Sequence, residues 1–187
     1  FLLTYDGKKH LPILGVSEKA REISIQVFSY SKGFNLMGLP HAMILIANPD
    51  IRQAWERWIE AFDFDYASNA FSIAAVTAVA GGEADSWLEA LTDYLQNHRD
   101  TFLRTVSERG WPLHPTKPEA SFLFWIDCRS SGIAPEELDR GFLEKAGISL
   151  NNGLAHGEAG RGFVRLNFAV TQKTLMTALD RIERLFR

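Results

Sequence analysis

The strongest constraint on the fold is a long helical period near the middle of the chain. Between Glu83 and Arg109 the side chains at helical spacing are those of Trp87 or Leu88, Leu91, Leu95, His98, Phe102 and Val106. Gly81-Gly82 precedes this segment and Gly110-Trp111-Pro112 follows it, and both are helix-breaking signals. We therefore predict one long helix at the midpoint of the 187-residue chain, where it would connect two lobes with a boundary near Asp85.

The amino-terminal lobe has the pattern of an α/β structure. Glu22–Tyr30 is rich in β-branched and aromatic residues, and His41–Ala47 is a near-continuous apolar run of strand length; both are typical of buried strands that are covered on both faces. Ser31–Pro40 between them holds two glycines and ends in proline, which predicts a loop or a short helical bend. Ile51–Phe62 and Ser68–Ala80 predict helices, and the second is so apolar that we expect it to be packed on all sides.

The carboxyl-terminal lobe predicts a small α/β layer. Its expected elements are strand Ser121–Asp127, helix Pro135–Ala146, short strand Ile148–Leu150, strand Gly162–Val170 and terminal helix Thr171–Phe186. A glycine-rich loop joins the last two strands. The chain is thus expected to be α/β, with residues 1–85 and 86–187 as its two parts.

Composition excludes several classes of partner. Twenty Lys and Arg against 23 Asp and Glu give a net charge of -3, so the basic surface that nucleic acid or an anionic membrane needs is not expected. The apolar runs Ala42–Ala47 and Phe71–Ala80 fall short of the roughly 20 residues that cross a bilayer. A single cysteine, Cys128, cannot form an internal disulfide, which fits the cytoplasm. The five histidines show no H-E-x-x-H spacing, so we expect no metal site.

Lys32 is the first candidate for chemistry. It directly follows an apolar strand and precedes Gly33, in a loop whose glycines would let a ligand approach the backbone. An amine partly removed from water loses its charge more readily and can attack a carbonyl carbon. Ser29 and Ser31 bracket it with hydroxyl groups, which together with backbone N–H groups commonly hold a phosphate ester. A solvated loop lysine remains the alternative.

Arg165 is the second candidate. Strand alternation places Val164, Leu166 and Phe168 on one face, and Arg165 between Phe163 and Asn167 on the other. A guanidinium flanked by large apolar groups needs an anion, because burying its charge unpaired costs several kcal/mol. Two partners remain open: an acidic side chain of this chain, or a ligand carboxylate held by two parallel hydrogen bonds.

Two separated motifs give the chain a resemblance to a known family. Ser29–Leu39 reads SYSKGFNLMGL and Gly157–Ala169 reads GEAGRGFVRLNFA, and the strand FLFWID at Phe122–Asp127 precedes Arg129. Their order and spacing resemble those of pyridoxal-phosphate (PLP) enzymes of fold type I, over essentially the whole chain. Within them the chain is most similar to the bifunctional aminotransferases and C-S β-lyases of the cystathionine β-lyase type.

The resemblance implies a role for each motif residue. Lys32 would hold PLP as a Schiff base and move the Cα proton of the substrate, Ser29 and Ser31 would bind the cofactor's phosphate, and Arg165 would bind the substrate α-carboxylate. Residues 1–85 would be the end of the large PLP-binding domain, and 86–187 the small carboxyl-terminal α/β domain. A C-S β-lyase is the leading activity, an aminotransferase the close alternative, and a non-catalytic α/β binding or regulatory domain the alternative of another class.

The chain also departs from the family pattern. The acidic residue that pairs with the pyridinium nitrogen and the aromatic that stacks on the ring lie upstream in relatives, so this chain looks like a carboxyl-terminal half. Pro40 stands where many aminotransferases have a basic phosphate-binding residue, and His41 could compensate. We expect the fragment alone to retain PLP poorly, to be inactive, and to expose apolar surface. By analogy, the full-length enzyme would be a homodimer.

Overall fold

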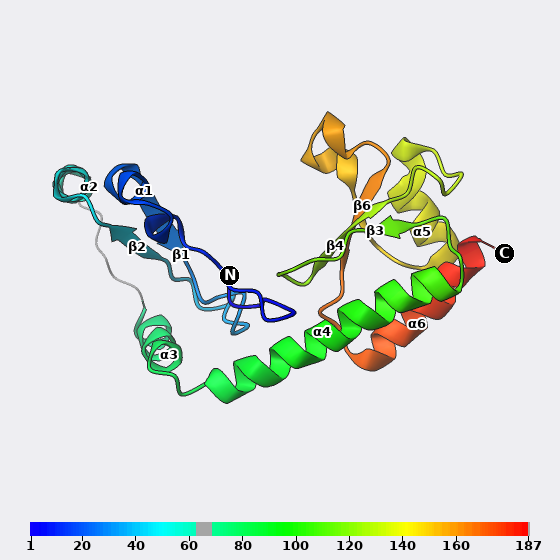
Figure 1. Ribbon diagram of the computed structural model, residues 1–187, viewed down its shortest axis with the longest axis horizontal. Helices are drawn as coiled ribbons and strands as arrows, with labels where there is room; N and C mark the ends of the chain where they lie inside the picture. Colours follow the sequence, from blue (N-terminus) through cyan, green and yellow to red (C-terminus); the bar gives the residue numbers. More distant parts are fainter. Residues whose placement is uncertain (63–68, 187) are drawn as a thin grey trace. The chain divides into compact units, whose positions relative to one another are not determined.

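The structure, a computed structural model, describes residues 1–62 and 69–186 and falls into two compact units (Figure 1). Unit 1 is Phe1–Leu2 with Lys9–Glu89, and unit 2 is Leu3–Lys8 with Ala90–Arg187. The predicted long helix is confirmed as α4, which spans Asp85–Glu108 and is 24 residues long. The assignment of residues 1–85 and 86–187 to a cofactor domain and a small domain stays a prediction.

Unit 1 holds a two-stranded antiparallel sheet with helices before and after it. Its elements are η1 (Ile13–Gly15), α1 (Glu18–Ile23), β1 (Ile25–Phe28), β2 (Met43–Ile46), α2 (Pro49–Ala61) and α3 (Ala70–Ala80). In the β1–β2 pair, Ile25 lies opposite Ile46 and Phe28 opposite Met43. The loop that carries Lys32 therefore starts and ends at neighbouring points of the sheet.

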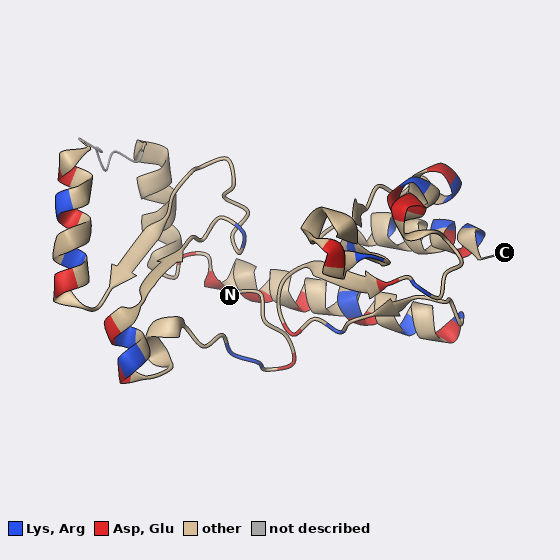
Figure 2. Ribbon diagram, turned by 90° about the horizontal axis from the view of Figure 1, so that it is seen from above, with Lys and Arg blue, Asp and Glu red and all other residues tan. Residues whose placement is uncertain are grey.

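Local capping explains where the helices of unit 1 begin. Asn48 accepts hydrogen bonds from the backbone N–H groups of Asp50 and Ile51 and Pro49 fills the first turn of α2, which is the usual start of a helix. Asn69 accepts from the N–H of Ser72 at the start of α3. Figure 2 shows charged residues along α2 but none along α3.

Several predicted boundaries in unit 1 were wrong. The strand expected from Glu22 begins at Ile25, because the Ser17 hydroxyl accepts from the N–H of Ala20 and starts helix α1 just before it. The strand predicted from His41 begins at Met43. Of the helix predicted for residues 68–80, Ser68 lies outside the described residues.

Burial in unit 1 also differs from the prediction. Val27 of β1 is 61% exposed and Phe71 of α3 is 77% exposed, so these strands are not covered on both faces and α3 is not packed on all sides. An apolar sequence pattern indicates that a segment tends to be buried. The described residues of unit 1 do not cover these apolar faces of β1 and α3. The expectation of exposed apolar surface is confirmed.

Unit 2 holds a four-stranded antiparallel sheet in the order β3-β4-β6-β5. Besides most of α4 it contains β3 (His114–Pro115), β4 (Leu123–Asp127), η2 (Pro135–Glu137), α5 (Leu138–Ala146), β5 (Asn151–Asn152), η3 (Gly153–His156), η4 (Glu158–Gly160), β6 (Phe163–Asn167), α6 (Gln172–Ile182) and η5 (Glu183–Leu185). α4 and α6 run side by side (Figure 1), joined by a 2.7 Å hydrogen bond from the N–H of Gln172 to the Tyr94 hydroxyl.

The predicted alternation along β6 is confirmed. Val164 and Phe168 are fully buried, and Leu166 is nearly so. Phe124 of β4 joins them and stacks on Phe102 of α4, with ring centroids 4.6 Å apart. The core of unit 2 thus lies between one face of the sheet and the helices, and Arg165 is left on the opposite face.

The short strand predicted at Ile148–Leu150 was wrong. Backbone pairing with β6 comes at Asn151–Asn152 instead, where the Asn152 amide also donates to the Pro135 carbonyl. The apolar side chains of Ile148 and Leu150 led to the prediction of a strand at this position. In the structure these side chains line a pocket of unit 2 instead. The shift by a few residues brings Asn151 opposite Arg165.

A buried arginine joins the segment Leu3–Lys8 to the rest of unit 2. Arg99 of α4 is fully buried, and its guanidinium donates to both carboxylate oxygens of Asp6, at 2.9 and 3.0 Å, and to the Pro118 carbonyl. Hydrogen bonds from Arg99 and then Lys117 lower the pKa of Asp6 to about 2. The charged form of Asp6 is therefore stabilised in the folded state.

We predict that this ion pair makes unit 2 sensitive to acid. Because the folded pKa of Asp6 lies below its ordinary value, its contribution is present above about pH 4 and is lost as the pH falls toward about 2. Asp6→Asn should lower the melting temperature at pH 7 and flatten its decline between those pH values. Glu119→Gln, which removes the exposed pair with Lys8, serves as the control and should change little. Equal melting temperatures of Asp6→Asn and the unaltered protein at pH 7 would contradict this account.

Candidate functional site

The loop after β1 brings Ser29 and Ser31 together. Their hydroxyl oxygens lie 2.9 Å apart, and the backbone N–H of Ser31 donates to Ser29 Oγ at 3.1 Å. Both residues are half-buried. Two hydroxyl groups are therefore held side by side immediately before Lys32.

Lys32 lies in a chain of turns that starts at these serines. The N–H of Phe34 donates to the Tyr30 carbonyl at 3.0 Å, and the N–H of Leu36 donates to the Ser31 carbonyl at 2.9 Å. The Lys32 side chain is exposed and its Nζ lies 2.7 Å from Met37 Sδ. Within the described residues no ion pair joins Lys32 to an acidic side chain, so its amine is not committed to a structural carboxylate.

His41 completes this cluster from the other end of the loop. Its Nε2 accepts a 3.0 Å hydrogen bond from the N–H of Tyr30 and lies 3.2 Å from Ser29 Oγ. Its Nδ1 lies 2.8 Å from the Leu39 carbonyl oxygen. The sequence named His41 as a residue that could compensate for Pro40, and did not predict its contact with Ser29 and Tyr30. The strand register could have indicated the contact, since Phe28 opposite Met43 brings residues 30 and 41 near each other.

Arg165 belongs to unit 2, where it stands between two strands. It lies opposite Trp125 of β4 and Asn151 of β5, and its Nη2 donates to Asn151 Oδ1 at 2.9 Å. Its Nε is buried and has no hydrogen-bond partner within the described part of the chain. No ion pair joins it to an acidic side chain among residues 1–62 and 69–186. Within these residues the internal salt bridge left open by the sequence is not formed, and Arg165 Nε has no partner among them.

Aromatic rings surround Arg165 on its face of the sheet. Trp125 stacks on Phe163 with centroids 5.5 Å apart, and His156 meets Trp125 edge-on at 5.6 Å. The guanidinium of Arg129 lies 5.1 Å from the Phe163 ring and binds Asp127, which lowers the pKa of that carboxyl. This face combines a cation that has unused donors with apolar walls.

A close backbone contact supports the loop that carries His156. A Cβ on Gly153 would lie 2.2 Å from the Gly160 carbonyl oxygen, and a Cβ on Gly160 would lie 2.1 Å from that of Gly153. Only glycine allows two backbones to approach this closely. The backbone of the glycine-rich loop thus packs against itself where Gly153 meets Gly160.

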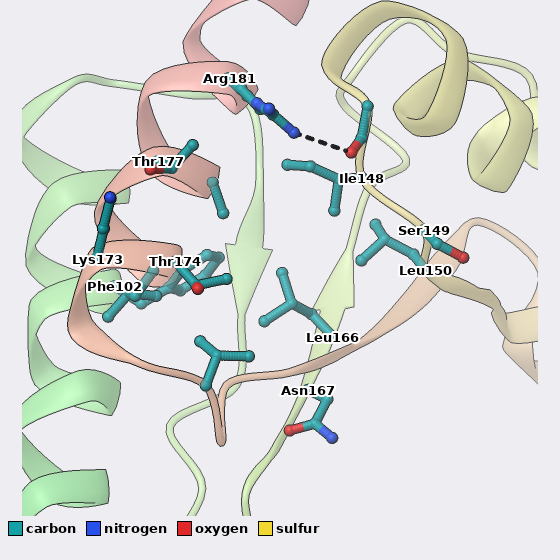
Figure 3. A pocket seen from close by; sticks show the side chains of 14 residues that line it. Phe102, Ile148, Ser149, Leu150, Leu166, Asn167, Lys173, Thr174, Thr177 and Arg181 are labelled. Carbon is teal, nitrogen blue, oxygen red and sulfur yellow. Dashed lines mark hydrogen bonds between the residues drawn. The ribbon is translucent and has the colours of Figure 1, made fainter.

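A pocket of about 580 Å³ lies elsewhere in unit 2 (Figure 3). Its floor includes Phe102 and Leu166, and its rim includes Lys173 and Arg181, whose Nη1 donates to the Gly147 carbonyl at 3.4 Å. None of the predicted site residues lines it. We therefore describe two separate candidate clusters, one around Lys32 in unit 1 and one around Arg165 in unit 2, and not this pocket.

Comparison with known proteins decides the family. The model of the family "Aminotransferase class I and II" matches residues 4–182. The chain belongs to this family. Its members depend on PLP, and the α/β architecture predicted for such an enzyme is confirmed.

Relatives of two activities are similar to this aminotransferase-family chain. Cystathionine beta-lyase PatB of Bacillus subtilis is 31% identical over 180 residues, which are 95% of this chain and 45% of PatB. LL-diaminopimelate aminotransferase 2 of Trichormus variabilis is 26% identical over 182 residues, 97% of this chain and 44% of that protein. The chain spans about half the length of the curated relatives it matches.

Solved structures agree with this assignment. A Corynebacterium diphtheriae protein described as a PLP-dependent β-cystathionase is 33% identical, with a TM-score of 0.87 over 100% of this chain and 48% of its own. No helix of the described segments is long and apolar enough to cross a membrane. In the same segments no three His, Cys, Asp or Glu side chains are grouped as a metal site.

The donor set fits the chemistry of the family's cofactor. A phosphate ester accepts hydrogen bonds, and the paired hydroxyls of Ser29 and Ser31 can donate them. An aldehyde carbon is attacked by an amine, and the exposed Nζ of Lys32 is free of acidic partners within the described residues. The residues of unit 1 that fit this cofactor are therefore Ser29, Ser31 and Lys32, which one loop brings together.

We predict that Arg165 contributes little to folding. Arg165→Ala removes one hydrogen bond to Asn151 and breaks no ion pair with any described residue, so the melting temperature should change little. Arg99→Ala, the matched control, removes a buried arginine and should destabilise unit 2 by about 3 kcal/mol, near the low end for buried pairs because Asp6 is partly solvated. Thermal melts of both variants test this. If Arg165→Ala lowered the melting temperature as much as Arg99→Ala does, Arg165 would be a structural residue.

Proposed function

We propose that this chain supplies part of the active site of a PLP-dependent enzyme of amino-acid metabolism, a C-S β-lyase of the cystathionine β-lyase type. The observation that carries the proposal is the pair of hydroxyls at Ser29 and Ser31 directly before Lys32, which makes no ion pair within the described residues, in a chain of the aminotransferase family. The 31% identity to a cystathionine β-lyase supports the choice of reaction.

Each residue has a distinct task in this proposal. PLP, when bound, supplies an electron sink for bonds at the substrate Cα. Lys32 would hold the cofactor through its amine and would take the proton from the substrate Cα. The hydroxyls of Ser29 and Ser31 would donate to the phosphate oxygens and so hold the cofactor beside Lys32.

Arg165 of unit 2 would bind the substrate. Its guanidinium donates two parallel hydrogen bonds to the substrate α-carboxylate, a geometry that fixes the orientation of the Cα–H bond. Asn151, bonded to Nη2, limits rotation of the guanidinium. The apolar walls of Trp125 and Phe163 exclude water beside it and strengthen the charge interaction.

An aminotransferase is the second candidate, because LL-diaminopimelate aminotransferases are also similar to this chain. Both reactions begin with carboxylate binding by Arg165 and proton removal by Lys32, so the residues named here serve either. We further propose that the enzyme in its full natural length is a cytoplasmic homodimer, and that the 187 residues alone retain PLP poorly and are inactive.

We predict that the full-length protein cleaves cystathionine without a 2-oxo acid acceptor. Each turnover breaks the Cβ–S bond, consumes one water, and yields homocysteine, pyruvate and ammonia. Lys32→Ala is the matched control and should form no pyruvate while its melting curve is retained. Pyruvate is measured with a coupled dehydrogenase.

Other results would contradict the β-lyase proposal. Products that form only when a 2-oxo acid is added would identify an aminotransferase. Near-normal turnover by Lys32→Ala would remove Lys32 from the mechanism.

A further inference from the structure

We propose that His41 is a positioning residue that shapes the Ser29–Ser31 loop for the phosphate of the cofactor. The inference rests on the proposed function, because it concerns the same cofactor site in unit 1. It goes beyond that proposal by giving a role to a side chain on the far end of the loop.

The hydrogen bonds of His41 define its protonation. The Leu39 carbonyl can only accept, so the Nδ1 that lies 2.8 Å from it carries the hydrogen. The N–H of Tyr30 can only donate, so Nε2 presents its lone pair to it at 3.0 Å. His41 is therefore a neutral imidazole that uses both nitrogens to join residue 30 to residue 39.

This bridge closes the loop at its base. The two bonded backbone groups, at Tyr30 and Leu39, belong to the two ends of the segment that contains Lys32. Pro40 has no N–H and cannot supply a closing backbone bond at its own position. The side chain of the next residue makes the bonds instead.

The closed base fixes the position of the Ser29 hydroxyl. Ser29 Oγ accepts from the N–H of Ser31 at 3.1 Å, and lies 2.9 Å from Ser31 Oγ and 3.2 Å from His41 Nε2. When its hydrogen turns to a phosphate oxygen, the Tyr30–His41 bond can remain and keep the loop in place. A site that is formed before binding loses less entropy when the ligand arrives.

The test compares PLP with pyridoxal, which has the same aldehyde and ring but no phosphate. In the full-length protein, His41→Ala should weaken PLP binding by about tenfold, the equivalent of one lost hydrogen bond, and pyridoxal binding by less than about twofold. His41→Gln, whose side-chain oxygen can accept from the Tyr30 N–H, should restore most of the PLP affinity. His10→Ala makes the same change at an exposed histidine of unit 1 and is the control.

Dissociation constants come from absorbance titrations of each variant, with circular dichroism to check folding. Equal weakening of PLP and pyridoxal binding would overturn the proposal, because it would show general support of the loop. Unchanged PLP affinity in both His41 variants would also overturn it and leave the proposed function standing. Failure of the unaltered full-length protein to bind PLP would instead reject the proposed function and this inference with it.

Discussion

The antiparallel pairing of β1 with β2 is the constraint on which the candidate cofactor site depends. Because Phe28 lies opposite Met43, the two ends of the intervening loop are held at neighbouring points of one sheet. Within that loop the Ser31 backbone turns back on Ser29, and His41 reaches Tyr30. The pairing of these two short strands therefore determines the placement of two hydroxyls and one imidazole, and leaves the amine of Lys32 exposed beside them.

A second register has the same importance for Arg165. Strand β6 lies between β4 and β5, so Arg165 is flanked by Trp125 and Asn151 while its sequence neighbours Val164 and Leu166 enter the core. The sheet thus presents a guanidinium on a surface that is fixed by apolar packing underneath. Arg99, the other central arginine of unit 2, has its donors used by Asp6, Asp100 and Pro118, which explains why one arginine supports the fold and the other is available.

The sequence was most informative where the pattern is local. Helical spacing predicted α4, alternation predicted the two faces of β6, and the motif around Lys32 predicted the family. It failed where the outcome depends on distant partners. The bond from Arg99 to Asp6 joins residues 93 positions apart, and the Asn151 contact depends on which residues of 148–152 pair with β6. Apolar runs at β1 and α3 predicted burial, which depends on surfaces that the described residues of unit 1 do not provide.

The central claim is that Lys32 forms the covalent bond to the cofactor, and chemical trapping tests it most directly. The full-length protein is loaded with PLP and treated with borohydride, which reduces the bond and makes it permanent, and the peptides are then mapped by mass spectrometry. The account predicts that the pyridoxyl group is found on the peptide that contains Lys32. Label on another lysine, such as Lys19 or Lys173, or no stable label on a protein that absorbs in the visible, would contradict it.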